Sequence, residues 1–297
     1  MNTTNSISNQ SYDFTLITSV ILTIVGLTGN SITIFIMAKP EMRRVSIFRY
    51  LMISMINDCL VLFTMWFFTF PQIFQNNSIG CKLSTYLSTL VYNYSGWIMV
   101  ASLVDRFFKV KYPTKKFHNQ NKFHSLVLII TFTILIFLSI PNYSYYDIYE
   151  SICITTDANV EFYVELSGAL IGVTIPFFLM IIITIMIGHS LIKKRKNIQN
   201  RKELKKEIRL IKMMISMSLF FLICNLPYFI QQLIHDTLSF HNQNLFNSDY
   251  IFNFVFNATN QVTFIYNSFG FFVCLLTNNI FRNYVCPKFS KINNSVI

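Results

Sequence analysis

The sequence predicts an all-α membrane protein, a bundle of seven transmembrane helices with its N-terminus outside. Of the 297 residues, 53% are hydrophobic and 12% are charged, whereas soluble domains usually carry about 25% charged residues. The mean hydropathy is +0.47. Seven runs are free or almost free of charge, and each exceeds the roughly 20 apolar residues that cross a bilayer as a helix. Their continuity favours helices over the alternating strands of a membrane barrel.

The predicted spans divide the chain into three parts. Residues 1–13 form an outer N-terminal segment, and residues 14–281 form the membrane domain. Residues 278–297 form a short amphipathic eighth helix and a cytoplasmic tail, because apolar and basic side chains are interleaved there. The uncharged runs are interrupted only by Asp58 and His189. The seven spans cover about 14–38, 48–72, 82–106, 124–146, 164–192, 211–235 and 250–275.

Basic residues gather on one side of the predicted bundle. Every Lys and Arg except Lys82 follows the first, third or fifth span or lies in the C-terminal tail. Loops rich in Lys and Arg stay in the cytoplasm, so the N-terminus lies outside. Residues 1–13 contain no Lys or Arg, so we expect the first span, and not a cleavable signal peptide, to direct insertion. The expected location is the plasma membrane, as a multi-pass integral protein.

Seven spans are compatible with a signalling receptor, a transporter or pump, or a retinal protein. A retinal protein needs a Lys in a late helix for its Schiff base, and the sequence has none between Lys212 and Lys288. A transporter usually carries several ionisable residues along its pathway, whereas Asp58 alone lies in the middle of a span. A receptor is therefore favoured, with a seven-helix transporter or a non-signalling membrane scaffold as the alternative. We expect neither an enzyme nor a nucleic-acid partner.

Two cysteines are expected on the outer side. Cys81 begins the third span, and Cys153 lies in the second outer loop, in an oxidising compartment. The other four cysteines fall within spans or in the inner tail. We therefore expect a Cys81–Cys153 disulfide that ties the loop to the third helix, with two free thiols as the alternative.

Several positions suit covalent modification. Sequons on the predicted outer side start at Asn2, Asn9, Asn76 and Asn142, and each is a candidate for glycosylation. Cys286 lies in the predicted eighth helix on the inner side and is a candidate for palmitoylation.

The spans also carry short motifs in a fixed order. Span three ends in Asp105-Arg106-Phe107, which is similar to a DRY motif with Phe in third place, and span six has Asn225 where FxxCWxP has Trp. The remaining motifs are Gly29-Asn30, Asn57-Asp58, Pro176, Phe221 to Pro227, and Asn267 to Cys274. Over nearly its full length the chain thus resembles the rhodopsin-like (class A) G protein-coupled receptors. Span seven is similar to that of invertebrate neuropeptide receptors, those for FMRFamide-like peptides included.

This resemblance implies a receptor that binds an extracellular ligand and activates a heterotrimeric G protein. Asp105, Arg106 and Phe107 would face the G protein at the inner end of span three. Pro227 removes a helical hydrogen bond and should make a hinge in span six. Basic residues of the third inner loop would contact the G protein or anionic membrane lipid. In the family, the inner half of span six moves outward when the ligand binds. The residues expected to take part in this movement are Phe221, Cys224, Asn225, Pro227 and Pro176.

The resemblance also implies an allosteric sodium ion, and no other cofactor or metal. Asp58 is a carboxylate at bilayer depth, which is costly unless it is paired, hydrated or protonated. Its expected neighbours are Asn30 and Ser95. Gly270 stands where the family has Asn, and Asn267, one helical turn earlier, could replace that side chain. A protonated packing residue is the alternative role for Asp58.

The outer surface predicts the charge of the ligand. The outer loops and tail carry eight acidic residues and the lone Lys82, and such a surface attracts cations. We expect a cationic ligand, a neuropeptide by the resemblance; a non-peptide chemosensory ligand is the alternative. Ser88 stands where amine receptors carry Asp, so a biogenic amine is not favoured. The candidate residues of the ligand mouth are Ser88, Glu161, Glu165, Tyr228, Gln232 and Asp236.

Overall fold

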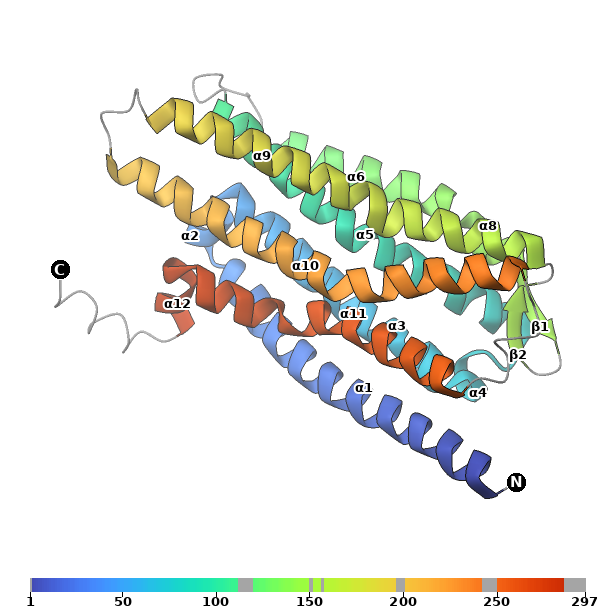
Figure 1. Cartoon of the computed structure of the whole chain (residues 1–297). Coiled ribbons are helices and arrows are strands. Elements are labelled where there is room, and N and C mark those ends of the chain that lie inside the picture. The colour runs from blue at the N-terminus through green and yellow to red at the C-terminus, as the bar shows by residue number, and fades with distance from the viewer. Residues whose placement is uncertain are drawn as a thin grey trace.

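A computed structural model describes residues 2–111, 120–149, 152–155, 158–195, 201–241 and 250–285. Long helices lie side by side in one bundle, with a small β-hairpin at one end and α12 at the other (Figure 1). The long helices are α1 (Asn2–Met37), α3 (Ser46–Thr69), α5 (Ser78–Lys111), α6 (Gln120–Leu138), α8 (Ala158–Ala169), α9 (Ile175–Arg195), α10 (Arg201–His241) and α11 (Tyr250–Thr277). The short elements are α2 (Pro40–Arg43), α4 (Pro71–Phe74), α7 (Ile140–Ser144), β1 (Tyr146–Tyr149), β2 (Ile152–Thr155), η1 (Leu170–Thr174) and α12 (Asn279–Val285).

The predicted fold class is confirmed. Six helical stretches in the described part of the chain are long and apolar enough to span a membrane: Tyr12–Met37, Ser46–Thr69, Ser78–Lys111, Leu126–Ser144, Leu166–Ile192 and Ile208–Gln231. The seventh span is α11, which carries no charged residue and has polar side chains among its apolar ones. Several of its polar side chains are buried, namely Gln261, Thr263, Asn267 and Ser268. They face neighbouring helices, since α11 packs against α1, α3 and α10.

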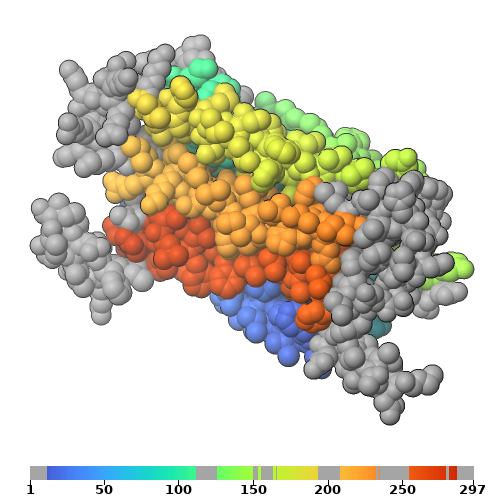
Figure 2. All heavy atoms as spheres, in the orientation of Figure 1, coloured from blue at the N-terminus to red at the C-terminus, as the bar shows by residue number. Residues whose placement is uncertain are grey.

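The bundle has a methionine-rich interior and an apolar exterior. The largest buried cluster includes Met55, Met99, Met213 and Met217. Large apolar side chains on the outside are also exposed, such as Leu276 at 77%. A soluble protein would rarely leave so many exposed, and lipid would cover them. On the face in Figure 2, α9, α10, α11 and α1 lie in this order, and the side chains of each helix pack against those of the next.

Span five contains a wide helical turn that the sequence did not predict. The turn η1 is π-helical, and the N–H of Ile175 donates to the carbonyl of Leu170, five residues earlier. The next such bond would need the N–H of Pro176, which proline lacks. The indole Nε1 of Trp97 on α5 donates instead to the carbonyl of Ile171, at 3.0 Å. Trp97 thereby supplies the donor that Pro176 cannot.

The second outer loop folds into a β-hairpin, which was also not predicted. β1 and β2 are antiparallel, and Ile148 pairs with Cys153. The strands lie at the end of the bundle where α10 finishes and α11 begins (Figure 1). This outer end carries the cavity described below.

Candidate functional site

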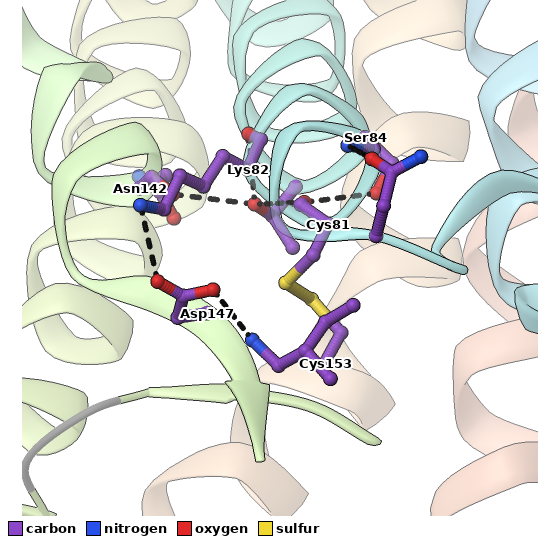
Figure 3. Close-up of a disulfide and its surroundings, with 10 residues drawn as sticks. Cys81, Lys82, Ser84, Asn142, Asp147 and Cys153 are labelled. Atoms are coloured by element: carbon purple, nitrogen blue, oxygen red, sulfur yellow. Dashed lines mark hydrogen bonds and ion pairs between the residues drawn. A yellow bond between two sulfur atoms is a disulfide. The ribbon is translucent and has the colours of Figure 1, made fainter. Parts of the chain in front are cut away.

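The hairpin is attached to the outer end of α5 by a disulfide and an ion pair. Cys81 and Cys153 are bonded, with their Cα atoms 5.6 Å apart, so the predicted disulfide is confirmed. Lys82 Nζ lies 3.2 Å from Asp147 Oδ2 on β1, and Figure 3 shows this contact beside the disulfide. Hydrogen bonds from the Ser78 side chain, the Ile148 N–H and Lys82 lower the pKa of Asp147, which keeps the carboxylate ionised. Two adjacent contacts thus fix the hairpin above the bundle.

A cavity of about 380 Å³ opens between the helices at this outer end. Its volume is within the range of small-molecule sites, roughly 300–1,000 Å³. The described lining is mainly apolar and aromatic, with uncharged polar groups and no charged side chain. Helix α5 contributes Thr85, Ser88, Thr89, Tyr92 and Asn93. The other walls come from α3, the end of α4, α7, α8, η1, α10, α11 and the hairpin.

Two of the six predicted mouth residues, Ser88 and Tyr228, line this cavity. The side chains of the other four, Glu161, Glu165, Gln232 and Asp236, lie outside the described part of the structure.

Among the predicted sequons, the structure is against Asn142. Its side chain is buried, with 8% of its surface exposed, and its Oδ1 accepts a hydrogen bond from Thr89 Oγ1 at 3.3 Å. A glycan has no room there, so this part of the glycosylation prediction is wrong. Asn76 is exposed between α4 and α5. The side chains of Asn2 and Asn9, and the whole of Cys286, lie outside the described residues.

Below the cavity, Asn225 takes the place of the family's Trp on α10. It is buried, and its Nδ2 donates to the carbonyl of Phe221 at 2.7 Å. The Phe221 ring packs edge-on against Tyr266 of α11, with centroids 5.0 Å apart. Pro227 lies inside α10, two residues further on. Cys224 is buried in the same cluster. Four of the predicted hinge residues thus lie together, whereas Pro176 follows η1 in span five.

Asp58 lies at the centre of a buried polar cluster. Ser95 Oγ lies 3.5 Å from Asp58 Oδ1, and Asn30 Nδ2 donates to the carbonyl of Asn267 at 2.9 Å. Among the buried oxygens that lack a hydrogen-bond donor in the described residues are Asp58 Oδ2, Asn30 Oδ1 and Asn267 Oδ1. Oxygens of this kind suit a hard cation or water, so the residues are compatible with the predicted sodium site.

Gly270 offers a way to test the sodium prediction. A Cβ at this position would lie 2.9 Å from Met55 Cε and 3.6 Å from Met217 Cε, and both are flexible chain ends. In the Gly270→Asn variant, we expect Met55 to move and the added oxygen to increase the thermal stabilisation by sodium relative to potassium. Gly270→Ala is the control, because it adds the crowding without the oxygen. If sodium and potassium act equally on both variants and on the native chain, Asp58 is a packing residue.

At the inner end, Ser46 joins three charged residues of α5. Ser46 Oγ donates to Asp105 Oδ2 at 2.6 Å, and Arg106 Nη2 donates to Ser46 Oγ at 3.3 Å. Lys109 Nζ forms an ion pair with Asp105 at 3.1 Å and also contacts Ser46 Oγ. Asp105 and Arg106 are buried. Phe107 packs on Phe108, with ring centroids 5.6 Å apart.

Sequence reasoning placed Asp105 and Arg106 here but missed Ser46 and Lys109. Lys109 follows Asp105 by four residues, a helical spacing that could have revealed it. Ser46 comes from a distant part of the chain, and no local pattern marks it.

The short helix α12 closes the inner end beside α2. Phe281 is fully buried against Phe271, with ring centroids 5.9 Å apart. The Tyr284 hydroxyl donates to the Glu41 carboxylate of α2, and this bond raises the pKa of Tyr284. Lys39 Nζ lies 5.0 Å above the Tyr284 ring. Together these contacts hold α12 against the first inner loop.

Comparison with known proteins gives the family. Residues 29–276 match the family described as 7 transmembrane receptor (rhodopsin family). A similar curated protein is the G-protein coupled receptor homolog K2 of Swinepox virus (strain Kasza), with 23% identity over 248 residues, which covers 78% of this chain. The chain spans 64% of the length of that relative. Because the family match covers well over half of the chain, the chain belongs to the rhodopsin family of seven-transmembrane receptors.

Proposed function

We propose that this protein is a plasma-membrane receptor that binds an extracellular ligand in the outer cavity and activates a heterotrimeric G protein at its inner end. One observation carries the proposal: a single helix, α5, joins the two sites. Its outer part lines the cavity, and its inner part holds the cluster of Asp105, Arg106 and Lys109. Cys81 and Arg106 lie 25 residues apart, roughly 37 Å along a helix.

The proposed ligand is a cationic peptide, related in type to the ligands of invertebrate neuropeptide receptors. The acidic outer segments support this charge, and a neutral aromatic or amide end of the peptide would enter the cavity, whose described lining is uncharged. The cationic groups would stay near the rim, because burying them without a partner is costly. A non-peptide ligand is the second candidate, because the cavity volume suits a small molecule.

A screen of basic peptides and neutral small molecules tests the ligand class. The receptor in nanodiscs is incubated with each compound and a heterotrimeric G protein, and nucleotide exchange is measured. The proposal expects a basic peptide among the activators. Activation by neutral small molecules alone would favour the second candidate.

Charge reversal at the mouth is expected to slow the association of a basic agonist. The triple change Glu161→Lys, Glu165→Lys and Asp236→Lys removes the attraction that guides cations, so we expect about a tenfold slower association and a flatter dependence on salt. Asp13→Lys is the control, because Asp13 lies on α1 and outside the cavity lining. Unchanged association in the triple variant would show that these acids do not guide the ligand.

A further inference from the structure

We propose that Tyr92 and Asn225 form a hydrogen-bonded switch at the inner end of the cavity. A ligand whose buried end carries a neutral hydrogen-bond acceptor, such as a carbonyl, opens the switch by accepting the hydrogen bond that the Tyr92 hydroxyl otherwise donates to Asn225. The inference rests on the proposed function in one respect, namely that the ligand enters this cavity.

Tyr92 belongs to both the cavity and the helix interface below it. Its side chain lines the cavity, and its hydroxyl donates to Asn225 Oδ1 at 2.5 Å. Tyr92 and Asn93 are the innermost lining residues of α5, whereas Tyr228 is the innermost of α10. Asn225 lies one helical turn further in. The hydroxyl therefore lies where an entering ligand meets the connection between α5 and α10.

The chemistry of the pair makes it responsive to an acceptor. A tyrosine hydroxyl has one proton to donate, and Asn225 receives it here. The amide nitrogen of Asn225 is occupied by the carbonyl of Phe221. A ligand acceptor that receives the hydrogen bond from the hydroxyl leaves a buried Asn225 carbonyl without a donor, and this destabilises the closed arrangement. An apolar ligand of the same shape fills the cavity without this competition.

The pair lies at a weak point of α10. Pro227 has no N–H, so the carbonyl of Ile223 lacks its helical donor, and helices bend at such positions. Helix α10 packs mainly against α11 and much less against α5. The bond from Tyr92 attaches the bend to α5, beside the apolar packing between the two helices. Loss of this attachment frees the inner half of α10 to move away from α5.

Variants that remove the hydrogen bond between Tyr92 and Asn225 test the switch without a G protein. Spin labels are placed at Lys111 on α5 and Lys212 on α10, both exposed near the inner end, and the distance between them is measured in nanodiscs by pulsed electron paramagnetic resonance. In Tyr92→Phe we expect about a fivefold larger population with the longer distance. Asn225→Leu should give the same shift, and the double variant should add nothing. Tyr92→Phe, the smaller change, decides the outcome if Asn225→Leu does not fold.

Tyr94→Phe is the matched control. This variant also removes one tyrosine hydroxyl from α5, two residues further along the helix. The Tyr94 hydroxyl donates to the carbonyl of Leu128 on α6, at 3.4 Å. The variant should leave the distance unchanged. A Tyr92→Phe distribution equal to that of Tyr94→Phe, or an additive double variant, would overturn the proposal.

Two small probes test the chemistry of the ligand. Acetophenone carries a carbonyl oxygen, and ethylbenzene has a similar shape without an acceptor. Acetophenone should lengthen the distance in the native receptor and have little further effect in Tyr92→Phe. If acetophenone leaves the distance unchanged, or if ethylbenzene lengthens it equally, the ligand's acceptor does not open the switch. A distance shift in a protein that activates no G protein would leave the switch standing and refute the proposed function.

Discussion

Replacement of Cys81 or Cys153 by serine is expected to remove most of the protein from the cell surface, and the double variant should be no worse than either single variant. The disulfide joins residues 72 positions apart. On chain-entropy grounds, a bond across such a loop contributes about 4 kcal/mol, a large part of the 5–15 kcal/mol that typically stabilises a folded protein. One bond can be lost only once, so the two changes cannot add.

Surface labelling of intact cells and thermal unfolding of the purified protein measure this effect. Cys59→Ser is the control, because Cys59 is a free thiol. Clearly additive losses in the double variant would show that the two cysteines act separately.

Replacement of Arg106 by alanine is expected to abolish G protein activation while surface expression remains. Arg106 is buried at the inner end of α5, where its guanidinium donates to Ser46. In the active state we expect this charge to turn toward the G protein. Nucleotide exchange at matched surface expression is the measurement. Normal exchange by Arg106→Ala would show that the inner cluster has only a structural role.

Ser46→Ala should act in the opposite direction to Arg106→Ala. Ser46 contacts Asp105, Arg106 and Lys109, so its loss weakens the resting cluster but leaves Arg106 in place. Raised basal exchange is the expected result. Basal exchange below that of the native receptor would contradict a restraining role for Ser46.

The sequence predicted the features that depend on composition and sidedness. Membrane helices are dictated by long apolar runs, and their direction by Lys and Arg in the loops. The disulfide followed from the topology, since Cys81 and Cys153 were the outer pair. Each of these properties is set by the residues of one segment, so it can be read without knowing how the helices pack.

Features that depend on contacts between distant helices could not be read from the sequence. Ser46 meets Arg106 across 60 residues, and Tyr92 meets Asn225 across 133 residues. Trp97 supports the π-helical turn η1. The only sign of this turn in the sequence was Pro176, which lacks a backbone N–H. Asn142 matched a sequon, but the fold buried it among helices. Each of these depends on which side of a helix faces which neighbour.

Guanine-nucleotide exchange on purified heterotrimeric G proteins tests the central claim most directly. The native receptor and Arg106→Ala are placed in nanodiscs at equal amounts, with and without the compounds of the ligand screen, against representatives of each G protein class. We predict that at least one G protein exchanges nucleotide faster with the native receptor than with Arg106→Ala. Equal rates for the two proteins in every combination would contradict the assignment of this chain as a G protein-coupled receptor.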